Sequence, residues 1–179
     1  ELYPFRHISS PFWNTYSLWG FEGMMMLAGT RLDLVKHACD RILARTLAEI
    51  REYASHGTAG IWIEECLTDV LSPAAFTELN QPYIRRLVDE IRNCGMNSIY
   101  YYTGNPAGKW DLITSVGADA LSLEESKKNF QVDIAEVAQR SGVPASTLRF
   151  YEEKGLIAST GRRGLRRVFD AGVLERLAL

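Results

Sequence analysis

The spacing of apolar residues separates a first segment without a clear period from a long helix. From Arg31 onward, apolar side chains recur every three or four residues, which is the spacing of one face of an α-helix. The pattern stops at His56 and Gly57, so it predicts an amphipathic helix that ends before them. Its apolar face consists of Leu34, Ala38, Ile42, Leu43, Leu47, Ile50 and Tyr53. Residues 1–30 are rich in aromatic residues and Gly, and we expect a loop with one short helix near 20–28.

Short apolar runs alternate with helical patterns in the middle of the chain. The runs at 60–64, 97–102 and 118–122 have the length of buried strands. Helices are predicted from the Ser72–Pro73 N-cap to Asn93, and from Lys109 to Val116. This alternation predicts βα units on a parallel sheet. About three strands are too few to close an eight-stranded barrel of about 250 residues, so the predicted fold class is an α/β partial (β/α) barrel segment.

A helix-turn-helix pattern follows. Asp133 is a suitable N-cap for a helix that buries Ile134, and Ser141–Pro144 predicts a tight turn. A second helix is expected from Ala145 to Lys154. The early positions of that helix are where a recognition helix in the major groove meets bases and phosphates.

The end of the chain has the composition of a wing. Gly155 supplies a helix stop, and Leu156–Ile157 is predicted to be the first wing strand. The segment 160–169 carries four Arg around two Gly, as expected of a hairpin whose guanidinium groups can lie against phosphates. A final helix over 171–179 is expected to pack on the first two. The sequence thus predicts a small, mostly α winged helix-turn-helix domain.

The charge is unevenly distributed along the 179 residues. From residue 134 onward eight Lys and Arg accompany five Asp and Glu, whereas the preceding residues carry twelve against seventeen. A basic tail on an acidic body is expected if only the tail meets nucleic acid. The hydrophobic content of 46% and charged content of 23% favour an ordinary globular protein over disorder, and no apolar run has membrane-spanning length. The three cysteines are widely spaced, so we expect a reducing, cytoplasmic setting without disulfides or a metal finger.

Residues 134–157 have the sequence Ile-Ala-Glu-Val-Ala-x-x-Ser-Gly-Val-Pro-x-x-Thr-Leu-Arg-Phe-Tyr-Glu-x-x-Gly-Leu-Ile. This segment resembles the signature of MerR-type transcriptional regulators. Gly164–Phe169 and Val173–Leu177 are similar to the wing and third helix of that family. The resemblance implies binding to double-stranded DNA by Ser146, Thr147, Arg149, Tyr151, Arg162, Arg163 and Arg167. Phe150 and Phe169 stand where the family commonly has Tyr, so any phosphate bond from those hydroxyls is lost. Such regulators dimerise through a long helix after the third, and this chain stops at Leu179.

Residues 10–133 resemble the middle of the uroporphyrinogen decarboxylase superfamily, which includes corrinoid-linked methyltransferases. The segments that carry this resemblance are Ser10–Phe12, Gly60–Glu64, Leu71–Phe76, Gln81–Tyr83, Thr103–Asn105 and Gly117–Glu125. The resemblance implies βα units from the middle of a barrel, with functional loops at the carboxyl ends of the strands.

The chemistry of either branch is incomplete in this chain. The methyltransferase branch binds zinc through a His-x-Cys pair, and Tyr101 and Thr103 stand in those places. We therefore expect no metal and no cofactor. Glu64, Glu65 and Tyr101 are the pocket candidates, although a solvated or helix-capping role is favoured for the carboxylates and core packing for Tyr101. His7 lies in a segment predicted to be irregular and is expected to have no chemical role.

The two resemblances meet at residues 132–142, which satisfy both, and the predicted domains are 1–132 and 133–179. Three hypotheses remain open. The chain is a DNA-binding regulator whose catalytically degenerate barrel segment senses a small-molecule effector or forms a homo-oligomer. Alternatively, it is a fragment of a decarboxylase or methyltransferase, inactive alone and completed by further strands. A third hypothesis is a chain without a function as a whole, whose open sheet edges pair with another copy.

Overall fold

The computed structural model describes residues 3–123, 132–133, 135, 138, 143–163, 166–169 and 173. The chain divides into two compact units, Glu1–Ser122 and Leu123–Leu179. In the first unit the elements are β1 (Phe5–Ser9), α1 (Pro11–Asn14), α2 (Tyr16–Thr30), α3 (Leu32–Ser55), β2 (Gly60–Glu65), η1 (Thr68–Val70), α4 (Pro73–Leu79), α5 (Gln81–Asn93), β3 (Asn97–Tyr102), α6 (Trp110–Thr114) and β4 (Ala120–Leu123). In the second unit they are β5 (Val132–Asp133), α8 (Ala145–Glu153), β6 (Ser159–Arg163) and β7 (Arg166–Phe169).

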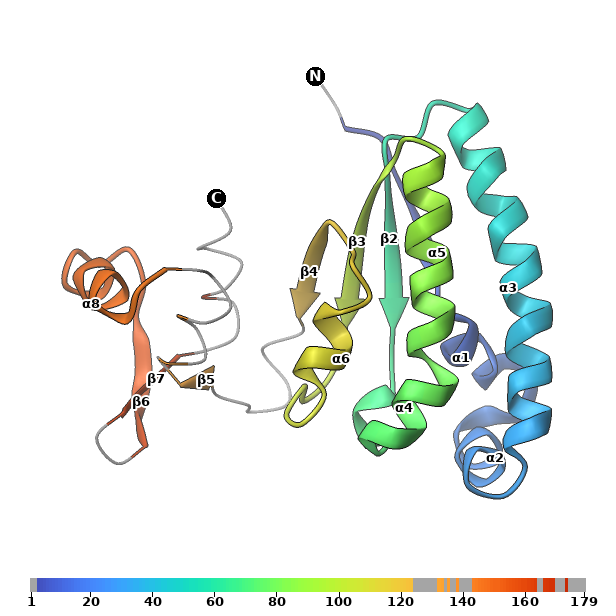
Figure 1. Ribbon diagram of the computed structural model, residues 1–179, viewed down its shortest axis with the longest axis horizontal. Helices are drawn as coiled ribbons and strands as arrows, with labels where there is room; N and C mark the ends of the chain where they lie inside the picture. Colours follow the sequence, from blue (N-terminus) through green and yellow to red (C-terminus); the bar gives the residue numbers. More distant parts are fainter. Residues whose placement is uncertain are drawn as a thin grey trace. The chain divides into compact units, whose positions relative to one another are not determined.

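The first unit is a four-stranded sheet in the order β1-β2-β3-β4, with helices following the strands (Figure 1). The pairs β1–β2 and β2–β3 are parallel, and the register places Ser9 opposite Glu64 and Glu64 opposite Tyr101. Helix α5 packs on β3 and on α3. The predicted α/β class is therefore confirmed for the front of the chain.

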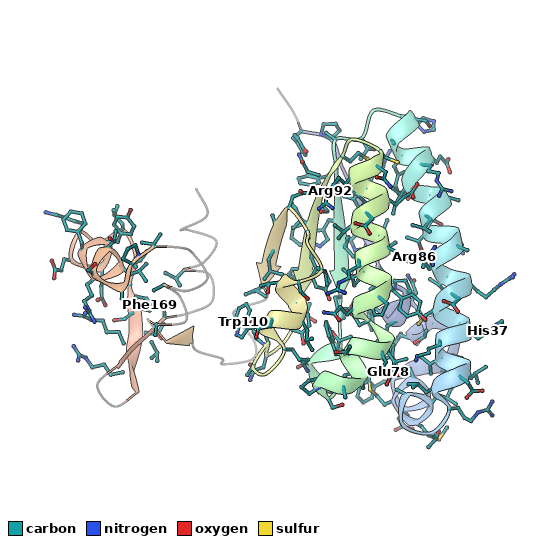
Figure 2. All side chains as sticks on the ribbon, viewed as in Figure 1. His37, Glu78, Arg86, Arg92, Trp110 and Phe169 are labelled. Carbon is teal, nitrogen blue, oxygen red and sulfur yellow. The ribbon has the colours of Figure 1, made fainter. Side chains whose placement is uncertain are left out.

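The sheet has one covered face and one half-buried face, because successive strand residues point to opposite sides. On β2 the side chains of Ile61, Ile63 and Glu65 are buried, whereas those of Trp62 and Glu64 are only partly so. The covered face meets the apolar stripes of the helices, and these side chains fill the space between the layers (Figure 2). The fully buried members of those stripes are Val35, Cys39 and Ile50 of α3 and Ile84, Leu87 and Ile91 of α5.

The ends of the helices follow the local chemistry of the sequence. The Ser72 hydroxyl accepts a hydrogen bond from Ala75 N at 3.2 Å and caps α4, with Pro73 in the first turn, as predicted. Helix α3 ends where Gly57 adopts a φ of +78°, a conformation that Gly tolerates at a helix C-terminus. The predicted helix 31–55 and strands 60–64 and 97–102 are confirmed to within a residue.

Three expectations for the first unit were wrong. Residues 5–9 form strand β1, so the described residues contain four strands in this sheet rather than three. The first helices occupy 11–14 and 16–30, with a break in α2 at Gly20, instead of 20–28 alone. The predicted helix 73–93 is two helices, because Asn80 leaves helical geometry and Pro82 restarts the next helix.

The second unit contains α8 and a three-stranded antiparallel sheet in the order β5-β7-β6. Helix α8 begins at Ala145, as predicted. The wing strand predicted at Leu156–Ile157 begins instead at Ser159, because Gly155 at a φ of +70° lets Leu156 N donate to Tyr151 O and close the helix end. Asp133, the predicted N-cap, lies in β5 opposite Val168.

Two further predicted helices of this unit fall largely outside the described residues. Of the helix predicted from Ile134, Ala135 and Ala138 are described, and both are helical. Of the helix predicted over 171–179, Val173 is described, and it is helical and buried.

Candidate functional site

Helix α8 exposes a face that carries polar and cationic groups. Ser146, Arg149 and Phe150 are exposed, whereas Leu148 is completely buried, as the sequence predicts. These positions are three and four residues apart, so they form one helical face. Thr147 and Tyr151 are half-buried and flank that face. The candidate recognition residues of α8 thus divide into two exposed and two flanking positions.

The wing is the antiparallel hairpin β6–β7. Its register places Arg162 opposite Arg167 and Arg163 opposite Arg166, with an irregularity between Ser159 and Gly161. Arg162 is exposed. The side chains of Arg163 and Arg166 lie outside the described residues. The four arginines predicted at a hairpin tip therefore stand on its two strands.

Glu152 is a contact residue that the sequence reasoning missed. Its Oε2 pairs with Arg167 Nε at 2.9 Å, and its Oε1 accepts hydrogen bonds from Ser159 N at 3.3 Å and from the Ser159 hydroxyl. Arg167, predicted as a DNA contact, is thus joined by an ion pair to α8. The sequence offers two adjacent acidic residues in the last turn of α8, Glu152 and Glu153, and does not distinguish them.

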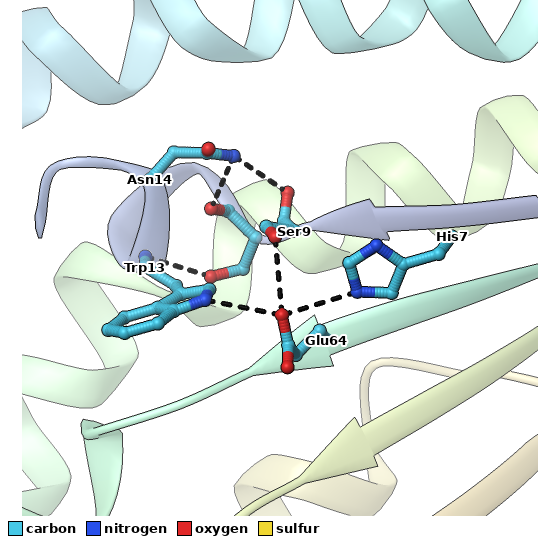
Figure 3. Close-up of polar contacts among 6 residues, drawn as sticks. His7, Ser9, Trp13, Asn14 and Glu64 are labelled. Carbon is cyan, nitrogen blue, oxygen red and sulfur yellow. Dashed lines mark hydrogen bonds and ion pairs between the residues drawn. The ribbon is translucent and has the colours of Figure 1, made fainter. Parts of the chain in front are cut away.

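At the carboxyl end of β2, the Glu64 carboxylate contacts three side chains from two elements, β1 and α1 (Figure 3). Its Oε2 lies 3.2 Å from His7 Nε2, 3.4 Å from Ser9 Oγ and 3.3 Å from Trp13 Nε1. His7 is on β1 and Trp13 on α1. His7, predicted to have no chemical role, is therefore part of this cluster because its segment is a strand and not irregular.

Tyr101 lies opposite Glu64 in the strand register, and its ring packs on Trp62 with centroids 4.9 Å apart. Both side chains belong to the half-buried face of the sheet. Thr103, the other position of the absent zinc pair, is buried. Among the described residues, no three His, Cys, Asp or Glu side chains gather so that they could hold a metal ion.

Glu65 points to the opposite face from Glu64 and is completely buried. Its Oε2 accepts a hydrogen bond from Asn80 Nδ2, and Tyr100 OH donates to Asn80 Oδ1 at 3.1 Å. Burial raises the pKa of the Glu65 carboxyl to about 8, although the Ser10 and Asn80 side chains, which favour the ionised form, offset part of this shift. The three pocket candidates thus do not share one surface.

The loops after β2 and β3 are joined by a buried lysine. Lys109 Nζ donates to the carbonyl oxygens of Thr68, Asp69 and Leu71 at 3.1, 2.8 and 2.6 Å. Gly104 adopts a φ of +98°, and a Cβ there would overlap the Asp69 carboxyl. These contacts fix the loops at the end of the sheet where (β/α) proteins carry their functional groups.

A hollow of about 410 Å³ lies between α2 and the start of α4. Its lining is mainly apolar and consists of Phe21, Met25, Ala28, Gly29, Val70, Leu71, Ser72 and Ala75. Phe21 and Val70 are exposed hydrophobic residues. The hollow is a shallow apolar groove that is largely open to solvent.

Comparison with protein families identifies both parts of the chain. The profile of the uroporphyrinogen decarboxylase (URO-D) family matches residues 7–148, and that of the MerR family regulatory proteins matches residues 133–169. The chain belongs to the uroporphyrinogen decarboxylase family and carries a MerR-type helix-turn-helix domain at its C-terminal side. Both family resemblances predicted from the sequence are confirmed.

Individual relatives match one part each. The chloroplast uroporphyrinogen decarboxylases of Zea mays and Nicotiana tabacum are 25% and 28% identical over 122 and 110 residues, which are 68% and 60% of this chain and 30% and 27% of those proteins. An HTH-type transcriptional activator SoxR homolog of Chromobacterium violaceum is 43% identical over 56 residues, 31% of this chain and 35% of that protein. The chain therefore spans about a third of the length of these curated relatives. None of the described helices combines the length and apolar character needed to cross a membrane.

Proposed function

We propose that the chain is a DNA-binding transcriptional regulator that contacts double-stranded DNA through α8 and the β6–β7 hairpin. The observation that carries the proposal is the register of the hairpin, which places Arg162 opposite Arg167 and Arg163 opposite Arg166. Like charges facing each other across strands destabilise a sheet. The Glu152 carboxylate offsets part of this cost at Arg167, and the phosphate backbone of DNA is a polyanion that offsets the remainder.

The proposed contacts divide between the two elements. On α8, Ser146 and Arg149 project from the exposed face and are assigned to base edges and phosphates, with Thr147 and Tyr151 at its margins. On the hairpin, the wing arginines Arg162 and Arg163 are assigned to phosphates, which fix position rather than sequence. Arg167 is not assigned to a phosphate, because its guanidinium group is paired with the Glu152 carboxylate.

We assign a sensing or oligomerising role to the front unit. The half-buried face of its sheet, which carries the packed rings of Trp62 and Tyr101, supports association with another copy, because burial of aromatic side chains contributes favourable free energy. The apolar hollow beside α2 supports a small-molecule effector of apolar character. Pairing of two front units would bring two DNA-binding heads together, as regulators that read two half-sites require.

The test is the affinity of the full chain for mixed-sequence duplex DNA across a salt series. We expect a steep loss of affinity with salt, and a slope that becomes shallower by about 1 in Arg162→Ala. Arg149→Ala should weaken binding by about 5- to 150-fold, since base contacts of this kind contribute about 1 to 3 kcal/mol. Arg45→Ala is the matched control, because Arg45 is an exposed arginine of α3 in the other unit. No binding by the parent at low salt, or unchanged binding by Arg149→Ala, would contradict the proposal.

A further inference from the structure

Glu152 lies where α8 meets both strands of the hairpin. One carboxylate oxygen pairs with Arg167 of β7, and the other accepts two hydrogen bonds from Ser159 of β6. The Glu152 and Arg167 side chains are only 20% and 28% exposed. A partly buried ion pair of this kind is screened by salt much less than a surface pair. A single carboxylate therefore connects α8 to both strands.

The same contact changes which cations are available to a ligand. Arg162 and Arg167 face each other across the hairpin, and Arg162 is exposed while Arg167 is partly covered. The negative charge of Glu152 lies 2.9 Å from Arg167 Nε and compensates its positive charge. Of this cross-strand pair, Arg162 is thus the cation that the hairpin presents.

We infer that Glu152 is a positioning residue for DNA binding, which holds the hairpin against α8 and keeps Arg167 away from phosphates. This inference rests on the proposed function, and it assigns Arg167 to the internal architecture of the wing. Removing the charge of Glu152 releases Arg167, so that the hairpin gains a phosphate contact and loses its fixed position. Both consequences can be measured in the full chain.

The first measurement is the salt dependence of binding to mixed-sequence duplex DNA for the parent, Glu152→Gln, Arg167→Gln and the double variant. Glu153→Gln is the matched control, because Glu153 is the exposed neighbour on α8 and its substitution changes the net charge equally. One added phosphate contact steepens the slope by about 0.9, which is about a 3.5-fold larger loss of affinity between about 50 and 200 mM salt. We expect this change in Glu152→Gln but not in Glu153→Gln. Adding Arg167→Gln to Glu152→Gln should abolish it, whereas Arg167→Gln alone should leave the slope unchanged.

The second measurement does not depend on DNA. Trypsin cuts after arginine only where the backbone opens, so its rate at the hairpin arginines reports how firmly the hairpin is held. We expect cleavage there to be several-fold faster in Glu152→Gln than in Glu153→Gln.

The outcomes separate this inference from the function on which it rests. Equal cleavage rates and equal slopes in the two glutamine variants would overturn the inference while leaving DNA binding intact. A slope lowered by about 1 in Arg167→Gln alone would also overturn it, because Arg167 would already contact a phosphate. Absence of DNA binding by the parent would refute the proposed function and the DNA part of the inference together. The steeper slope, abolished by Arg167→Gln, would establish the positioning role.

Discussion

Glu65 makes the stability of the front unit depend on pH in a way that one substitution can isolate. The side chain is completely buried on the covered face of β2, and its carboxyl pKa is raised from a usual value near 4.5 to about 8. The folded state therefore keeps the proton at neutral pH, whereas the unfolded chain loses it. Asn80 Nδ2 donates to this carboxyl, and the next partner along the network is Tyr100.

The difference between the two pKa values sets the size and the sign of the effect. Between about pH 4.5 and pH 8 the folded state binds one more proton than the unfolded state, so stability falls as the pH rises by about 1.4 kcal/mol per unit. At pH 7 the accumulated loss is about 3 kcal/mol, and above about pH 8 the dependence levels off because both states are ionised. The stabilisation due to the proton is fully present only below pH 4.5.

Glu65→Gln removes this titration and keeps the shape of the side chain. Its amide oxygen can accept from Asn80, but burying the amide N–H donors costs about 1 to 2 kcal/mol, so we expect a net gain of about 1 to 2 kcal/mol at pH 7. The sharper signature is the loss of the slope of about 1.4 kcal/mol per pH unit.

Urea unfolding followed by tryptophan fluorescence measures this slope. All four tryptophans lie between Trp13 and Trp110, so the signal reports the front unit alone. Glu22→Gln is the control, because Glu22 is exposed on α2 in the same unit and its substitution removes the same charge. Parallel pH profiles for the parent and Glu65→Gln between about pH 5 and 8 would refute the reasoning, since any histidine contribution is common to both.

Three further predictions concern the same unit. Gly104→Ala should lower the free energy of unfolding by about 2 to 4 kcal/mol in urea titration, because the new Cβ meets the Asp69 carboxyl at a positive φ. Lys109→Met should cost about 2 to 4 kcal/mol by leaving three carbonyls without their common donor, whereas Lys36→Met, which removes an exposed pair with Glu78, should cost less than about 1. The buried Cys39, whose pKa is raised to about 12 by burial, should resist iodoacetamide in the folded chain at pH 8 and react at once in urea, as followed by mass spectrometry.

The elements that could be predicted from the sequence are those whose burial has a period. In α3 the buried residues Val35, Cys39, Leu43, Thr46 and Ile50 follow steps of three and four, so the helix bounds were predictable. The predicted apolar face was wrong in part, because it shares Leu43 and Ile50 with this buried stripe but includes Leu34, which is exposed. Strand β1 has no such signal, because Phe5, Arg6 and His7 are exposed at the edge of the sheet and Ile8 is its one buried residue. The sequence cannot show that this short run pairs with β2.

The break between α4 and α5 depends on a contact that is distant in the sequence. Asn80 leaves helical geometry, and its amide joins the buried Glu65 and Tyr100 of two strands. Pro82, two residues later, was the available signal, since Pro favours the first turn of a helix over its interior.

At the candidate site, the roles of some residues could be predicted from the sequence and those of others could not. Adjacent strand residues point to opposite faces, so the separation of Glu64 from Glu65 follows from the period of the strand alone. Which of the two is buried requires the helices to be in place. The role of Glu152 was not predictable from charge, because Glu152 and Glu153 are chemically identical neighbours on α8. The hairpin register and the position of Ser159 distinguish them.

The beginning of the region that matches both family profiles has a defined place in the fold. Both family profiles cover residues 133–148, so sequence similarity alone assigns this stretch equally to the decarboxylase-like and the regulator-like part. In the fold, Val132 and Asp133 form β5 and pair with Phe169 and Val168 of the wing. Backbone pairing with β7 ties the beginning of the shared stretch to the same sheet that carries the basic hairpin. The MerR-type domain thus uses residues that a decarboxylase profile also accepts, so the two family matches overlap within one chain.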